Sequence, residues 1–183
     1  MARPGAAIRI IGSPMSAYIR PQGDAKVLHV SFDDNYASWY DSLPLLERLG
    51  LQATFYVNTL PIMDTSSPEE RDAYFERLDY HGPRICLARG QLRELAAAGH
   101  EIGCHSHSHF NLARLPRSQW DTEIKDSKQQ LETILGHRVE HFSYPFGMRR
   151  FFSEPLRQYC RALGFTTVAS AAPGLLHAPL IDP

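Results

Sequence analysis

Three histidines within five residues, His105, His107 and His109, are the part of the sequence best suited to chemistry. Neutral imidazole is the commonest metal ligand in proteins, and protonated histidines repel one another, so the cluster is favourable chiefly when its members share a cation. If the backbone is extended, all three side chains lie on one face. If it turns helically after a strand, His105 and His109 share one side and His107 points elsewhere. A histidine- and serine-rich loop without a specific metal is the third interpretation.

Two adjacent aspartates, Asp33 and Asp34, are the second chemical feature, and they follow an apolar segment at residues 26–32. One carboxylate and two histidines would give zinc three protein ligands and leave a position for water. The other carboxylate could then accept a proton from that water. The alternative is that the aspartates and Asn35 form only a turn or a helix cap.

Alternating strand and helix patterns provide the elements that must position these groups. Apolar and β-branched segments predict strands. Between them, segments whose apolar residues have helical spacing predict helices, and a glycine ends four of these segments. This order is typical of parallel strands joined by helical crossovers, whose C-terminal ends meet at one edge. The strands are predicted at residues 6–11, 26–32, 52–57, 100–104, 139–144 and 165–169, and the helices at 42–49, 68–79, 91–98, 116–135 and 153–163.

The length of 183 residues suits one domain but is short for a complete eight-stranded barrel, which typically needs ~250 residues. We therefore predict an α/β fold, an irregular or incomplete (β/α) barrel with parallel strands. Nineteen basic and 20 acidic residues give a net charge of −1 without a long single-sign block, which argues against a nucleic-acid partner. The three scattered cysteines provide neither a disulfide framework nor a metal clip.

No continuous apolar segment has the form of a signal peptide or the length of a transmembrane helix. The default prediction is therefore a cytoplasmic protein, and the oligomeric state stays undetermined.

The chain contains, in this order, the segments Val-Ser-Phe-Asp-Asp, Ala-Thr-Phe-Tyr-Val, Gly-His-Glu-Ile-Gly-Cys-His-Ser-His-Ser-His and Phe-Ser-Tyr-Pro-Phe-Gly. Together they resemble the motifs of the polysaccharide deacetylase family, the NodB-homology domain of carbohydrate esterase family 4. The resemblance covers about residues 26–175. It implies an N-terminal extension at residues 1–25 and a catalytic domain at 26–183, shortened at its C-terminus. It also allows a location in the cell envelope or outside the cell.

The resemblance implies a role for several residues. Asp33 matches the catalytic base, and Phe146 matches the residue whose backbone N–H polarises the substrate carbonyl. His177, within Leu-Leu-His near the C-terminus, is a candidate general acid, although its neighbours have the composition of a loop. The implied metal is Zn²⁺, with Co²⁺ as an alternative, on Asp34, His105 and His109, and the implied substrate contacts are Tyr144 and Pro145.

Two departures from the family pattern concern the site. Ser143 stands where many members have an arginine that orients the catalytic aspartate, and Phe146 replaces a tyrosine. The first change affects the tuning of Asp33 and leaves the metal ligands intact.

The predicted function is a metal-dependent hydrolase that removes an N-acetyl or O-acetyl group from a carbohydrate. The first alternative is a C–N hydrolase of the same fold that acts on a small non-sugar amide or formyl group. The second is an inactive carbohydrate-binding module. The partner is therefore a carbohydrate or a small acyl-amide substrate.

Overall fold

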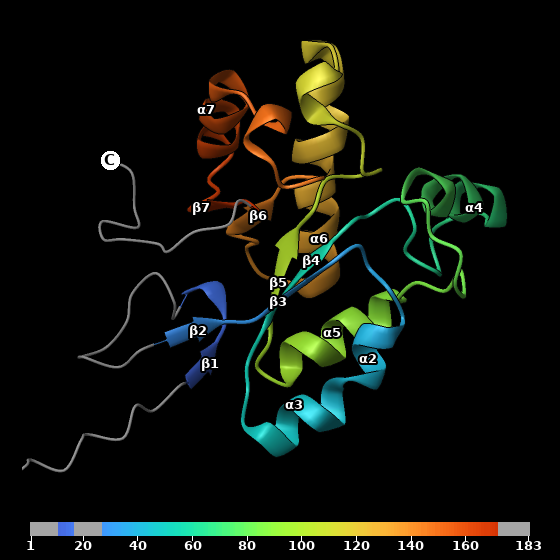
Figure 1. Ribbon diagram of the computed structural model, residues 1–183, viewed down its shortest axis with the longest axis vertical. Coiled ribbons are helices and arrows are strands. Elements are labelled where there is room, and N and C mark those ends of the chain that lie inside the picture. Colours follow the sequence, from blue (N-terminus) through green and yellow to red (C-terminus); the bar gives the residue numbers. More distant parts are fainter. Residues whose placement is uncertain (1–10, 17–26, 172–183) are drawn as a thin grey trace, which may run out of the picture.

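The structure is a computed structural model that describes residues 11–16 and 27–171. Its centre is a five-stranded sheet in which every pair of neighbouring strands is parallel and strands adjacent in sequence are adjacent in the sheet (Figure 1). That order is the order of a barrel wall, so the predicted incomplete (β/α) barrel is confirmed. The strands are β3 (Ser31–Asp33), β4 (Thr54–Val57), β5 (Glu101–Cys104), β6 (His141–Ser143) and β7 (Thr167–Ala169).

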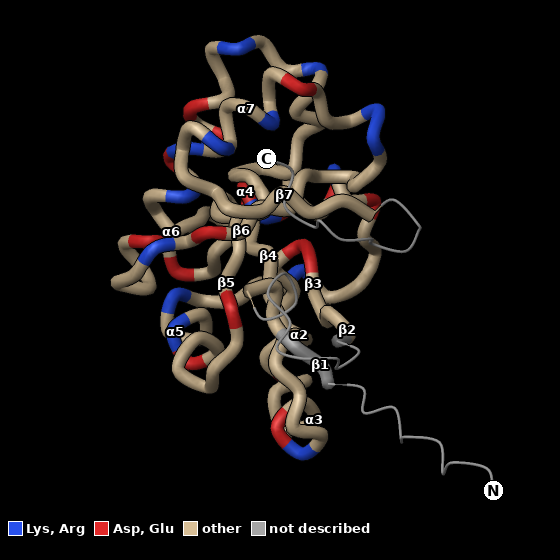
Figure 2. Tube along the Cα trace, turned by 90° about the vertical axis from the view of Figure 1, so that its left-hand side faces the viewer, with Lys and Arg blue, Asp and Glu red and all other residues tan. Residues whose placement is uncertain are grey.

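Helices fill each connection between these strands, as the alternating pattern predicted. Two short helices follow β3, two follow β4, and one precedes each of β6 and β7. Figure 2 shows acidic and basic residues interspersed along these connections, in keeping with the nearly balanced charge. The helices are α2 (Ser38–Asp41), α3 (Leu43–Leu49), α4 (Pro68–Arg77), α5 (Arg89–Ala97), α6 (Ser127–Leu135) and α7 (Glu154–Ala162).

Local sequence signals set several of the helix ends. The Ser67 side chain accepts a hydrogen bond from the backbone N–H of Glu70, whose carboxylate accepts one in return, so α4 begins with a capping box. Gly50 and Gly136 end α3 and α6 in the left-handed conformation, with φ of 63° and 77°. These boundaries were predicted because they depend only on neighbouring residues.

The predicted strand at residues 26–32 divides between two sheets. Its first part, β2 (Val27–His29), pairs in parallel with β1 (Ile11–Ser13), and its second part becomes β3. Between them, the Val30 carbonyl accepts a hydrogen bond from the Thr54 N–H at 3.0 Å. β1 extends two residues beyond the strand predicted at residues 6–11, because its position depends on pairing with β2 rather than on local composition. Residues 6–10 of the predicted first strand lie outside the described residues.

The helix predicted at residues 116–135 is regular only in its second part. A 3₁₀ turn at Arg117–Gln119 and a π-helix at Asp121–Asp126 precede α6. The prediction of one regular helix is therefore wrong for the first half. The wider π turn buries Glu123 and Ile124, and the Glu123 carboxylate binds a loop at the end of β5.

The core lies between the sheet and the helices that cover it. β4 is buried at all four positions, as expected of a parallel strand with both faces covered. Among the described residues, no helix combines the length and the apolar composition needed to cross a membrane. The largest core side chains include Phe55, Phe142, Leu92, Leu95, Ile124 and Leu131.

Candidate metal and active site

The C-terminal ends of three strands bring the predicted site residues together. Asp33 ends β3 and Asp34 follows it, His105 follows β5, and Ser143 ends β6. Together with neighbouring loops they surround one open pocket of about 270 Å³. The residues that line it are Asp33, Asp34, Tyr36, Arg77, Leu78, His105, His109, Phe146, Gly147 and Ala171.

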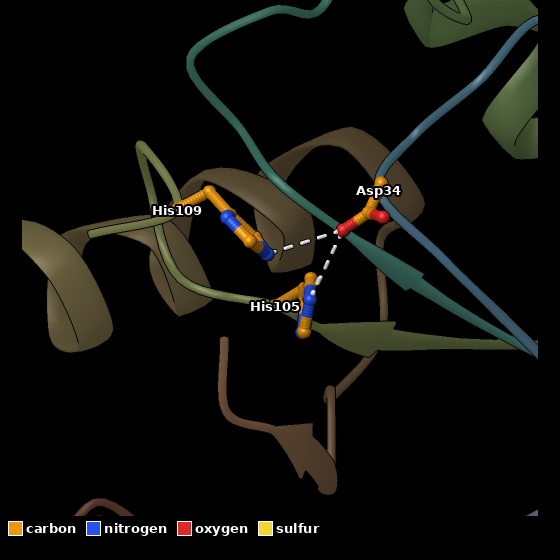
Figure 3. A group of neighbouring side chains, drawn as sticks. All are labelled: Asp34, His105 and His109. Atoms are coloured by element: carbon orange, nitrogen blue, oxygen red, sulfur yellow. Dashed lines mark ion pairs between the residues drawn. The ribbon is translucent and has the colours of Figure 1, made fainter. Parts of the chain in front are cut away.

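Asp34, His105 and His109 form a compact group at this pocket (Figure 3). One oxygen of Asp34, Oδ1, lies 3.3 Å from Nε2 of His105 and 3.3 Å from Nε2 of His109. One ligand atom from each residue lies within 4.8 Å of the other two. This arrangement has the composition and spacing of a three-ligand metal site.

His107 points away from this group. Its Nδ1 lies 2.9 Å from Oγ1 of Thr59. The backbone turns sharply between the two outer histidines, with positive φ at Ser106 (68°) and His109 (61°), so the chain is neither an extended strand nor a regular helical turn. Of the two metal geometries considered from the sequence, the structure has the one in which His105 and His109 share a side.

The tautomer of His105 tests whether these residues suit a cation. Its Nδ1 lies 2.7 Å from the Ser143 carbonyl, which can only accept, so Nδ1 carries the hydrogen. In neutral His105 the Nε2 lone pair therefore faces the Asp34 carboxylate. Oδ1 of Asp34 is buried and has no hydrogen-bond donor among the described residues. Two lone pairs that face each other in a buried site require a positive charge between them, and a metal ion fits this need.

The pKa values of Asp34, His105 and His109 are shifted by burial and by contacts within this group. Burial would raise the pKa of Asp34, but the contacts and charges of the two histidines outweigh it and lower that pKa. Burial would lower the pKa of His105, and the adjacent Asp34 raises it instead. For His109, burial dominates and the pKa is lowered. The group thus favours a positive charge at its centre, whether a proton or a metal ion.

Asp33 differs from Asp34 in position and surroundings. Its side chain is 42% exposed, its Oδ2 lies 4.0 Å from Nε2 of His105, and it is not part of the compact group. Burial raises its pKa, and the nearby charge of Asp34 raises it further, whereas His105 lowers it. Ser143, at the position of the family arginine, reaches Oδ2 of Asp33 only with a weak hydrogen bond at 3.5 Å.

The loop after β6 presents Phe146 to the pocket. This residue has a positive φ of 67°, is 45% exposed, and packs against His109 with tilted rings whose centroids are 4.9 Å apart. Its backbone N–H donates no hydrogen bond to the described residues. Tyr144 and Pro145 are buried, and Tyr144 stacks on Phe152. Their contact with substrate stays a prediction, and His177 lies outside the described residues.

Asn58 and Tyr74 support the candidate metal group, which is Asp34, His105 and His109. Neither was assigned a specific role from the sequence. The Asn58 amide donates to the His105 carbonyl, and the Tyr74 hydroxyl lies 2.8 Å from Oδ1 of Asn58 and 2.9 Å from the Asp34 carbonyl. They thereby connect the loops after β3, β4 and β5. Asn58 follows a predicted strand and was expected at this edge of the sheet for that reason, but Tyr74 lies mid-helix without any local signal.

The fold and the strand-end group define a class of part-barrel α/β proteins with a candidate metal site. A family model described as polysaccharide deacetylase matches residues 20–168, so the chain belongs to the polysaccharide deacetylase family.

Individual relatives agree with this membership. The chain is 27% identical over 151 residues to the Bacillus subtilis (strain 168) protein described as "Putative polysaccharide deacetylase YxkH", which covers 80% of this chain and 47% of that protein. It therefore spans about half the length of this curated relative. Two solved structures share the fold. The BpsB deacetylase domain from Bordetella bronchiseptica has a TM-score of 0.68 and 20% identity, covering 90% of this chain and 73% of that one. The Streptococcus pyogenes deacetylase PplD in complex with acetate has a TM-score of 0.65 and 21% identity, covering 86% and 62%.

Proposed function

We propose that this chain is a metal-dependent hydrolase that removes an N-acetyl or O-acetyl group from a carbohydrate. One observation carries the proposal: Oδ1 of Asp34 is buried, accepts no hydrogen bond from the described residues, and lies between two histidine nitrogens, beside a second aspartate that is open to the pocket. Family membership supports carbohydrate deacetylation as the reaction. The acetate complex of PplD is a finding about that protein, and it agrees with an acetyl-processing site here.

Asp34, His105 and His109 would hold the metal ion, Zn²⁺ or Co²⁺. When bound, such an ion supplies Lewis-acid chemistry, which lowers the pKa of water and polarises an acyl carbonyl. Asp33 accepts the proton of the attacking water, because its carboxylate borders the pocket without belonging to the metal group. The Phe146 N–H donates to the oxygen on which negative charge develops, and its position depends on the backbone rather than on the side chain.

A single experiment should distinguish the roles of the two aspartates. Acetate release from an N-acetylated chito-oligosaccharide is measured with the metal-stripped protein after addition of Zn²⁺ or Co²⁺, and metal content is measured in parallel. Asp34→Asn should lose metal and turnover together, because an amide is a poor replacement for an anionic ligand. Asp33→Asn should keep the metal and lower turnover by about 10²–10⁴-fold, the usual contribution of a general base.

Asp79→Asn is the matched control, because the Asp79 side chain is 94% exposed. Its backbone has a positive φ of 51°, and that of Asp34 is positive as well. It should change neither metal content nor turnover. Equal metal loss in the Asp33 and Asp34 variants would contradict the division of roles. Tight binding of the oligosaccharide by the metal-loaded chain without acetate release would instead indicate a carbohydrate-binding module.

A further inference from the structure

Arg77 lines the same pocket as the metal group but has no part in the reaction described above. It is the last residue of α4, and two contacts fix its guanidinium. Nε donates to the Ser108 carbonyl at 2.9 Å, and Cζ lies 4.7 Å from the centre of the Phe110 ring. The group is therefore held in place at the pocket wall, whereas a free surface arginine would sample many rotamers.

The charge of Arg77 lacks a direct counter-ion. Among residues 11–16 and 27–171, no carboxylate lies within 4.0 Å of its guanidinium nitrogens. Nη2 is buried without a hydrogen-bond acceptor in that part of the chain, and Nη1 has none there either. Burial lowers the pKa of the guanidinium, while the more distant charge of Glu123 raises it. A cation that is partly removed from water and unpaired favours an anion brought by a ligand.

Resting on the proposed function, we propose that Arg77 binds a carboxylate carried by the acetylated sugar. A guanidinium matches a carboxylate in geometry and charge. The pocket of about 270 Å³ is slightly smaller than the roughly 300–1,000 Å³ usual for small-molecule sites, so Arg77 and the metal group would contact the same sugar unit. Arg77 is the only lysine or arginine among the described residues that line the pocket, so it is the group suited to bind the carboxylate. Arg77 is thus a specificity-determining residue, and the preferred substrate is an acidic N-acetylated sugar.

A matched pair of substrates tests this proposal. One is an oligosaccharide containing N-acetylmuramic acid, and the other is the same oligosaccharide with its lactyl carboxylate converted to a carboxamide. The wild-type chain should have a kcat/KM for the carboxylate form higher by on the order of tenfold, because a charge-assisted hydrogen bond is stronger than a neutral one. Arg77→Gln should remove this preference, and the loss should fall mainly on KM for the carboxylate form.

Two further variants separate the contact from a structural effect. Arg77→Lys keeps the charge without the planar fork and should retain part of the preference. Arg84→Gln is the matched control, since Arg84 pairs with Asp72 at 3.0 Å and does not line the pocket. It should leave the preference unchanged. Equal rates on both substrates in the wild type, or a preference that persists in Arg77→Gln, would overturn the proposal.

Calorimetric binding of the deacetylated forms of both oligosaccharides keeps this inference separate from the proposed function. If neither substrate is turned over, the proposed function fails, and binding alone then decides the role of Arg77. Tighter binding of the carboxylate form in the wild type but not in Arg77→Gln would support the contact. Equal binding of both forms would refute it.

Discussion

Carboxylates contact histidines at both ends of the central sheet, and the two places differ in how completely the protein satisfies their polar atoms. At the C-terminal ends of the strands, Oδ1 of Asp34 has no donor among the described residues. At the N-terminal ends, Glu101 begins β5 and His141 begins β6, with Nε2 of His141 3.6 Å from the Glu101 carboxylate. The residue types are the same, but their surroundings differ.

The Glu101 carboxylate is satisfied within the chain. It accepts hydrogen bonds from the Ser16 N–H at 3.2 and 3.3 Å and from the Thr54 hydroxyl at 3.0 Å. The other ring nitrogen of His141 lies 2.8 Å from the Thr167 hydroxyl. The described residues satisfy both side chains, so this pair leaves no ligand atom for a cation. The comparison indicates that unsatisfied polar atoms, more than residue types, distinguish a binding site from a structural ion pair.

Metal affinity should give the largest difference between the two ends. His105→Ala or His109→Ala should lower Zn²⁺ affinity by more than the roughly 10–100-fold that loss of an outer-shell partner costs. His107→Ala and His141→Ala should leave affinity and stoichiometry unchanged. Competition with a chromophoric chelator measures this on the metal-stripped protein. Loss of stoichiometric binding in His107→Ala would mean that the assigned ligand set is wrong.

Low pH should lower the stability of the protein through Glu101, which lies at the N-terminal ends of the strands. Burial raises the pKa of Glu101, but the contacts with His141 and Ser16 outweigh it and lower the pKa from 4.5 to about 2. The ionised form is therefore preferred in the folded state, and its stabilisation is complete above pH 4.5 and is lost as the pH falls toward 2. Partial exposure of the carboxylate screens this interaction, so we expect about 2 kcal/mol rather than the ~3 kcal/mol that the full change in pKa implies.

Urea unfolding of the wild type and Glu101→Gln between pH 2 and 7 measures this contribution. The difference in unfolding free energy should be largest near neutral pH and vanish near pH 2. Saturating Zn²⁺ should stabilise both proteins equally, because the metal group lies at the other end of the sheet. A constant difference at every pH would show that packing, and not charge, determines the role of Glu101.

The smallest expected effect concerns Glu123, which supports the loop that follows β5 and carries His109. The buried Glu123 accepts from the Ser108 N–H at 3.0 Å and also from the Ser108 hydroxyl, next to His109, a proposed metal ligand. Glu123→Gln should lower Zn²⁺ affinity about tenfold, the low end of the range for outer-shell partners. Glu132→Gln is the control, since Glu132 pairs with Lys128 at 2.5 Å on α6 and has no contact with this loop. Equal affinity in both variants would show that the loop holds its shape without Glu123.

The features predictable from the sequence were those that depend on short stretches of chain. The capping box before α4, the glycines that end α3 and α6, and the placement of the aspartates and histidines after strands all follow local rules. The alternation of elements then fixed the common edge, and hence which side chains could meet. The catalytic and metal-binding roles themselves stay predictions until the variants are measured.

Features that depend on distant partners were not predictable. The split of residues 26–32 between two sheets is determined by the pairing of β2 with β1, which composition does not encode. Arg77 is an ordinary helical arginine in the sequence, and only the fold brings it to the pocket beside Ser108.

The π-helix at Asp121–Asp126 holds one residue more than a regular α-helix would hold there. Each residue of an α-helix turns the chain by about 100°, so an extra residue in regular helix would rotate everything before it around the axis relative to α6. The wider turn takes up this extra residue, and the segments on either side keep the directions that one regular helix would give them. Deleting one residue between positions 121 and 126 should therefore restore regular α-helix and leave the preceding residues facing as they do now, whereas the same deletion within α6 would turn them by about 100°. This segment can thus lose one residue where the rest of the helix cannot.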